Sequence, residues 1–120
     1  MKPKLPEIGQ PCTSDQIRSL ALIYRKMDII DALANPPVGV FVSDGCTSWP
    51  DEWRGHNLYP ACFWHDVRYW CGKDGDEMGR LRADAQLMLD VAETVSVELG
   101  ETMFAGVRIA GGKHWGSGRK

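Results

Sequence analysis

The sequence contains no run of roughly 18 consecutive apolar residues, the length at which a segment becomes a candidate for crossing a membrane. It has no excess of positive charge either, because 14 lysines and arginines stand against 16 aspartates and glutamates. That balance gives no electrostatic footprint for nucleic acid, so we expect no nucleic-acid partner. The first residues, MKPKLPEIGQP, lack the apolar core of a secretory signal, so nothing in the chain as written predicts its export.

What is present is an ordinary globular composition with four cysteines. The 120 residues are 43% hydrophobic and 25% charged, close to the average for soluble folded proteins. A chain of this length is sufficient for one domain with its own core, so residues 1–120 are expected to form a single domain. The even cysteine count is compatible with two disulfides or with a metal site.

Four segments are predicted to be helical, so the expected fold class is all-α. The first runs from Thr13 to Asn35, begins with a capping-box pattern and is stopped by Pro36 and Pro37. The others cover about residues 59–70, 76–99 and 102–110. The remaining parts are an N-terminal arm at 1–12, a long loop at 38–60 and a flexible C-terminal tail at 111–120. Long loops inside small domains are often functional.

The third predicted helix carries the strongest amphipathic pattern in the chain. Its apolar residues recur at three- and four-residue steps: Leu81, Ala85, Met88, Ala92, Val95 and Leu99. Asp84 falls on the same stripe, three residues after Leu81 and four before Met88. Since an unpaired carboxylate on a core face is costly, Asp84 is predicted to have a polar partner on another helix.

The second predicted helix places several reactive side chains within two turns. They are Cys62, His65, Asp66 and Tyr69. If this helix packs antiparallel to the next, Asp84 can accept the ring N–H of His65 and leave the other ring nitrogen as a base. Neighbouring residues on a helix point about 100° apart, so Asp66 is expected to face a different side from His65.

Three motifs together resemble the phospholipase A2 superfamily, in particular its small bacterial and fungal-type members. They are SDGCTSWPD at 43–51, ACFWHDVRYW at 61–70 and RLRAD at 80–84. These look like the calcium loop, the Cys-x-x-His-Asp-x-x-Tyr helix and the helix with the partner aspartate. The resemblance implies an all-α fold in which two long antiparallel helices carry the His/Asp site, beside an N-terminal helix and a calcium-loop-like segment.

The same resemblance implies a catalytic role for three residues. His65 matches the general base that activates a water, and Asp84 matches the aspartate that orients this histidine. Tyr69 matches the tyrosine whose hydroxyl supports the aspartate. A positioned general base typically contributes a factor of about 10²–10⁴ to the rate, so no serine nucleophile is required.

Calcium is the implied cofactor. Its ligands would be the Asp44 carboxylate, the backbone carbonyl of Gly45 and the Asp66 carboxylate, by their match to the motif. A hard cation with oxygen ligands can offer an open position where the ester oxygen gathers charge. Calcium is therefore expected to stabilise the oxyanion.

The resemblance also implies that disulfide bonds staple the fold. Cys46 and Cys62 match a disulfide that ties the calcium loop to the catalytic helix. Cys12 and Cys71 are then left as a second candidate bridge. Disulfides belong to oxidising compartments, so an extracellular or periplasmic location is expected, with release by cell lysis as one route for a chain without a signal.

The implied activity is the hydrolysis of the sn-2 ester of glycerophospholipids, with a phospholipid membrane surface as the partner. We expect a monomer or a weak homo-oligomer. After Glu101 the chain has no acidic residue, whereas Arg108, Lys113, Arg119 and Lys120 follow. This basic end can approach an anionic surface.

Two other interpretations stay open at this point. One keeps the phospholipase-like fold without the activity, as a binding protein or a phage-associated packaging protein, and the missing signal favours it. The other is a small structural zinc-binding domain, since Cys-x-x-His followed by another cysteine is within the ligand vocabulary of zinc. The candidate ligands would be Cys46, His56, Cys62, His65 and Cys71.

Overall fold

The computed structural model describes residues 2–47 and 49–120 and is mostly helical, as predicted. The helices are α1 (Ser14–Ile23), α2 (Met27–Ala32), α3 (Tyr59–Trp70), α4 (Glu77–Thr94) and α5 (Val97–Ala110). Two 3-10 turns follow, η1 (Gly112–His114) and η2 (Ser117–Arg119). The strands β1 (Glu52–Trp53) and β2 (His56–Asn57) form a short antiparallel hairpin before α3.

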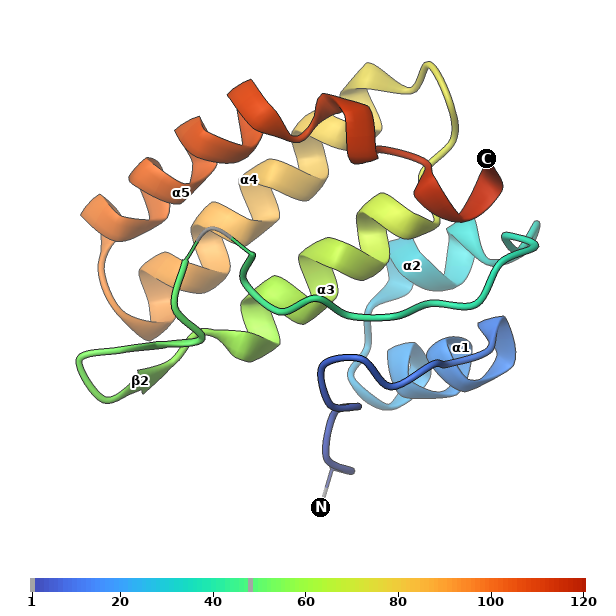
Figure 1. Cartoon of the computed structure of the whole chain (residues 1–120), viewed down its shortest axis with the longest axis horizontal. Helices are drawn as coiled ribbons and strands as arrows, with labels where there is room; N and C mark the ends of the chain where they lie inside the picture. Colours follow the sequence, from blue (N-terminus) through green and yellow to red (C-terminus); the bar gives the residue numbers. More distant parts are fainter. Residues whose placement is uncertain (1, 48) are drawn as a thin grey trace.

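Helix α3 lies at the centre of the fold and has the predicted bounds (Figure 1). One side packs against α1 and α2 through Phe63 and Val67. The other side packs against α4 and α5 through Ala61 and Cys62. Helix α4 runs antiparallel to α3, and α5 returns beside α4 (Figure 1). The antiparallel arrangement that the site requires is therefore present.

The N-terminal helix differs from its prediction because it is two helices. Arg25 has a φ of +58°, a left-handed conformation that a continuous α-helix does not allow. In one unbroken helix Leu33 would point about 160° away from Ile17, at about 100° per residue. The break turns α2 so that both side chains are buried in the same apolar cluster against α3.

The third predicted helix ends earlier than expected, at Thr94. Ser96 begins α5 as its N-cap, since its side chain accepts a hydrogen bond from the backbone N–H of Leu99. Gly100 then lets α5 approach α4 closely, because a Cβ at this position would lie 2.6 Å from the carbonyl oxygen of Met88. The last helix is therefore longer than predicted and starts at Val97.

The buried face of α4 is not the predicted apolar stripe. Leu81, which was expected to face the core, is 36% exposed. The buried residues of α4 are Arg80, Ala83, Asp84, Leu87 and Val91. Asp84 is therefore buried as predicted, but the apolar residues beside it are Ala83, Leu87 and Val91, which also recur at four-residue steps. Arg80 is buried with them because it finds hydrogen-bond partners.

The C-terminal residues, predicted to form a flexible tail, pack against the ends of α2 and α3. Trp115 is buried, and its indole N–H donates to the carbonyl oxygen of Lys73 at 2.7 Å. The guanidinium of Arg119 donates to the carbonyl oxygens of Cys71 and Ala32. The structure thus replaces the expected loose end with two short turns tied to the helices.

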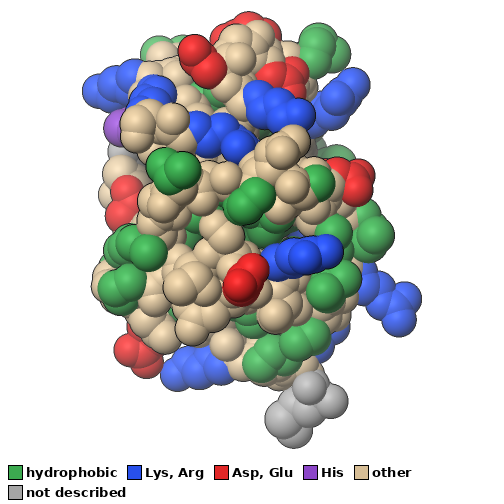
Figure 2. Space-filling model, turned by 90° about the vertical axis from the view of Figure 1, so that its right-hand side faces the viewer, with side chains coloured by type: hydrophobic (Ala, Val, Ile, Leu, Met, Phe, Trp, Pro, Cys, Tyr) green, Lys and Arg blue, Asp and Glu red, His purple; other side chains and the backbone are tan. Residues whose placement is uncertain are grey.

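The surface on the right-hand side of Figure 1 has a mixed character. Figure 2 shows hydrophobic side chains there in separate groups between basic and acidic ones. Such scattering is normal for a face in contact with water. None of the helices in the described ranges is long and apolar enough to cross a membrane.

Candidate functional site

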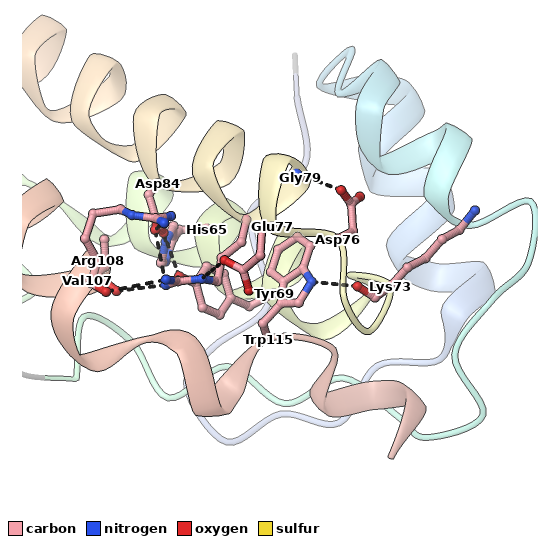
Figure 3. Close-up of polar contacts among 11 residues, drawn as sticks. His65, Tyr69, Lys73, Asp76, Glu77, Gly79, Asp84, Val107, Arg108 and Trp115 are labelled. Atoms are coloured by element: carbon pink, nitrogen blue, oxygen red, sulfur yellow. Dashed lines mark hydrogen bonds and ion pairs between the residues drawn. The ribbon is translucent and has the colours of Figure 1, made fainter.

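Asp84 is the central residue of the candidate site and is fully buried between α3 and α4. Its Oδ1 lies 2.8 Å from Nε2 of His65 and accepts a 2.7 Å hydrogen bond from the hydroxyl of Tyr69 (Figure 3). His65 and Tyr69 are four residues apart on α3, so both side chains reach the same face of α4. The structure therefore brings together the three residues that were predicted as the catalytic group.

Asp84 stays ionised in spite of its burial. Burial alone would raise the pKa of this carboxyl group, but hydrogen bonds from His65, Tyr69 and Arg108 leave the pKa below its ordinary value. An ionised acceptor requires the proton of the imidazole to lie on Nε2, so the free lone pair of His65 is on Nδ1. Burial and the bond to Asp84 raise the pKa of Tyr69, so its hydroxyl remains a donor.

Two arginines that the sequence analysis did not place in the site complete the surroundings of Asp84. Arg108, on α5, donates from Nη1 to Oδ2 of Asp84 at 2.8 Å (Figure 3). Arg80 places Nη1 3.6 Å from the same Oδ2 and 3.2 Å from the hydroxyl of Tyr69. Arg80 stands four residues before Asp84, which is a recognisable helical pair. Arg108 lies 24 residues from Asp84, so no helical spacing links the two residues. The sequence placed Arg108 only among the basic residues that follow Glu101.

Asp66 points away from this group and meets the loop before β1. Its Oδ2 is buried and has no hydrogen-bond partner among the described residues. The pKa of Asp66 is raised to about 9, first by burial and then by the neighbouring Asp44 carboxyl group, with a smaller opposing effect from the Asp44 backbone. The two carboxylates predicted as metal ligands are therefore adjacent.

The loop next to these carboxylates has a conformation that requires glycine. Gly45 has a φ of +71°, and a Cβ there would lie 2.8 Å from Oδ1 of Asp51 and 2.9 Å from Cδ1 of Ile8. The loop is held by the Gly45 N–H, which donates to Ser43 Oγ, and by the Cys46 N–H, which donates to Asp51. The turn that carries Asp44 and the Gly45 carbonyl is thus fixed from both sides.

A disulfide between Cys46 and Cys62 joins this loop to α3, as predicted, with a Cα–Cα distance of 5.1 Å. It closes a loop with a sequence separation of 16 residues, and a bond over such a loop typically stabilises a fold by about 3 kcal/mol. Because Cys62 precedes His65 by one helical turn, the bond also fixes the loop relative to the part of α3 that carries His65.

The candidate second bridge is not formed. Cys12 and Cys71 are free and buried, within the part of the chain that the structure describes. Cys12 pairs through its backbone with Phe41, whereas the Sγ of Cys71 points back toward the carbonyl oxygen of Arg68. Burial raises the pKa of both thiols, to about 11 for Cys71, so each is expected to be a weak nucleophile.

The zinc interpretation finds no support in this arrangement. Cys46 and Cys62 are consumed by the disulfide and cannot bind a metal as thiolates. Across residues 2–47 and 49–120, no three side chains of His, Cys, Asp or Glu converge on a common point. A cation near Asp44 and Asp66 would therefore need backbone or water oxygens as well, which suits a hard cation better than zinc.

The site thus combines two chemical elements on one helix. His65 offers a free Nδ1 whose ring is oriented by a buried carboxylate, and its side chain retains about 10% exposure. Asp66, the next residue, offers an unpaired carboxylate oxygen beside Asp44. An oriented imidazole with a free nitrogen, next to two carboxyl groups, has the chemistry that metal-assisted attack of water on an ester requires.

Comparison with known proteins yields a partial relationship. Over 56 residues, 47% of this chain, the sequence is 36% identical to a secretory phospholipase A2 from Arthroderma benhamiae (strain ATCC MYA-4681 / CBS 112371). The matched stretch spans 36% of that protein, so most of the relative has no counterpart in the match. No family model and no solved structure matches the chain. The comparison supports a phospholipase A2-like relationship for part of the chain.

Proposed function

We propose that this protein hydrolyses the sn-2 ester of glycerophospholipids in a calcium-dependent reaction, like the small bacterial and fungal-type phospholipases A2. The observation that carries the proposal is the 2.8 Å contact between His65 Nε2 and buried Asp84, which leaves Nδ1 free to act as a base. The partial match to a secretory phospholipase A2 supports the same reaction class.

Within this proposal, His65 takes a proton from a water molecule at Nδ1 while the water oxygen attacks the ester carbonyl. Asp84 stabilises the resulting imidazolium and holds the ring, and the Tyr69 hydroxyl holds Asp84. The proton then passes to the departing glycerol oxygen when the ester C–O bond breaks. The products are a fatty acid and a lysophospholipid.

The residues beside His65 fit a calcium ion. Asp66 has a buried oxygen without a partner, and its pKa is raised to about 9 by burial and by Asp44. A divalent cation bound there would favour the ionised form of Asp66 and balance the negative charge of the two side chains. Asp44, the Gly45 carbonyl and Asp66 would hold it, and calcium bound there would supply a Lewis acid for the charge that develops on the ester oxygen.

The proposal extends to the setting of the reaction. The substrate would be presented by a phospholipid surface, and the protein would act as a monomer or a weak homo-oligomer. The disulfide between Cys46 and Cys62 supports an extracellular or periplasmic location.

Calcium titration by calorimetry tests the cofactor directly. We expect the wild-type protein to bind one calcium ion with a dissociation constant of about 0.1–1 mM, the range of extracellular calcium modules. Asp66→Asn removes a charged ligand and should weaken binding at least about tenfold, because fewer charged ligands mean lower affinity. Asp31→Asn, an exposed carboxylate on α2, is the matched control and should bind like the wild type. Equal affinity in all three proteins would place the ion elsewhere.

A further inference from the structure

We propose that Arg108 is a positioning residue for the pair formed by His65 and Asp84; this inference rests on the proposed function. Arg108 lies near the end of α5, outside the three motifs that carry the resemblance. Its Nη1 donates to Oδ2 of Asp84 at 2.8 Å, whereas His65 and Tyr69 both bind Oδ1. Oδ2 therefore has no partner from α3, and Arg108 makes the shortest contact with it.

The geometry explains why that contact matters. A carboxylate rotates about a soft bond with broad minima, so two partners on Oδ1 alone do not fix the plane of the group. Arg108 approaches Oδ2 from α5, so partners from α3 and α5 hold the carboxylate at both of its oxygens. The plane of Asp84 in turn sets the direction of the His65 ring and of its free Nδ1.

Arg80 does not duplicate this role. Its Nη1 is 3.6 Å from Oδ2, beyond hydrogen-bond distance, and its guanidinium donates to Tyr69 and to the carbonyl oxygens of Val107 and Arg108. Arg80 thus ties α4 to the end of α5, the part of the helix that carries Arg108. Arg108 is the arginine that reaches the carboxylate, and Arg80 holds the backbone from which Arg108 extends.

The burial of Asp84 and the partial exposure of Arg108 support the role of Arg108 as a positioning residue. Asp84 is fully buried, and a buried charge is costly unless it is paired and hydrogen-bonded. Arg108 keeps part of its side chain exposed, at 27%, so a substitution there can be accommodated more easily than one at buried Arg80. This makes Arg108 the better residue for separating orientation from folding.

The test compares Arg108→Gln and Arg108→Lys with the control Arg82→Gln, an exposed arginine on α4. For Arg108→Gln we expect kcat to fall about 10- to 100-fold, the range typical of contacts that orient a functional group, with KM within about twofold. Arg108→Lys keeps the charge without the planar fork and should give an intermediate kcat. The control should match the wild type in both constants.

A spectroscopic measurement accompanies the kinetics. The ¹⁵N signals of the His65 ring report which nitrogen carries the proton, and they can be assigned by their loss in His65→Gln. We expect the Nε2–H form to dominate in the wild type and the control, and to decrease in Arg108→Gln. Arg108→Lys provides the same readout if the glutamine variant does not fold.

The outcomes separate this inference from the proposed function. If the wild type releases no fatty acid, the proposed function fails, and the tautomer measurement still decides whether Arg108 orients the pair. Unchanged kcat and an unchanged tautomer in Arg108→Gln would overturn the inference. A rise in KM with kcat unchanged would also overturn it, because Arg108 would then bind the substrate rather than position the base.

Discussion

Replacement of His65 by alanine is expected to lower calcium-dependent ester hydrolysis by about 10²–10⁴-fold, the contribution typical of a general base. The reason is structural: Asp84 orients the His65 ring through Nε2, so Nδ1 of this ring is the nitrogen that can accept the proton. The fold should remain, because Asp84 keeps its bonds to Tyr69 and Arg108. Initial rates of fatty-acid release, with circular dichroism as the check on folding, measure the effect.

His114→Ala serves as the matched control, since His114 is exposed in η1, and it should retain the wild-type rate. His65→Gln should resemble the alanine variant, because glutamine can hold a hydrogen bond but cannot accept a proton as a base. A folded His65→Ala protein with more than about half of the wild-type rate would assign the base to another residue.

Replacement of Asp84 is expected to have the largest effect on stability. Asp84→Ala leaves the buried guanidinium of Arg80 and the side chain of Arg108 without their shared carboxylate, and breaking a buried ion pair typically costs about 3–5 kcal/mol. The activity should fall with it, because the His65 ring loses its orienting partner. Urea unfolding followed by circular dichroism measures the change in the free energy of unfolding.

The pH dependence of the free energy of unfolding, compared between the wild type and Asp84→Asn, shows whether the stability comes from the charge of Asp84. The pKa of Asp84 is lowered in the folded protein, so its ionised form contributes stability above the unfolded value, near 4. This contribution is lost as the pH falls through the folded pKa. The difference between the wild type and Asp84→Asn should therefore be full at neutral pH and shrink below about pH 4.

Asp90→Asn, on the same helix, is the control for a carboxylate in an ordinary environment. The Asp90 carboxylate accepts a hydrogen bond from the side chain of Gln86. Its replacement should therefore change the free energy of unfolding by no more than about 0.5 kcal/mol. A stability loss of that small size in Asp84→Ala would contradict the view that Asp84 holds the buried charge network together.

Local patterns predicted the parts of the fold that local forces determine. Helix α3 is bounded by a loop and by Cys71-Gly72, and it has the predicted limits. The contact between His65 and Asp84 followed from the cost of burying a carboxylate, and the disulfide between Cys46 and Cys62 from the motif. The helix and the contact depend on residues whose pattern is visible in the sequence, whereas the disulfide pairing came from the resemblance to the phospholipase A2 superfamily.

Tertiary contacts explain the parts that were missed. The break at Arg25 allows α1 and α2 to share one apolar cluster, and nothing within the helix pattern marks it. Arg108 reaches Asp84 across 24 residues of sequence, and the last turns are held by Trp115 and Arg119 through backbone carbonyls of distant segments. Such contacts depend on how the helices pack in three dimensions, and the hydrophobic periodicity of a single segment does not contain that information.

Fatty-acid release from phospholipid vesicles, measured against calcium concentration, tests the central claim most directly. The wild-type protein, with its disulfide between Cys46 and Cys62 intact, should release the sn-2 fatty acid at a rate that rises over about 0.1–10 mM calcium and stops when a chelator is added. Asp66→Asn should need more calcium than the wild type. No release by the folded protein at about 10 mM calcium would contradict the account and favour a phospholipase-like binding protein without activity.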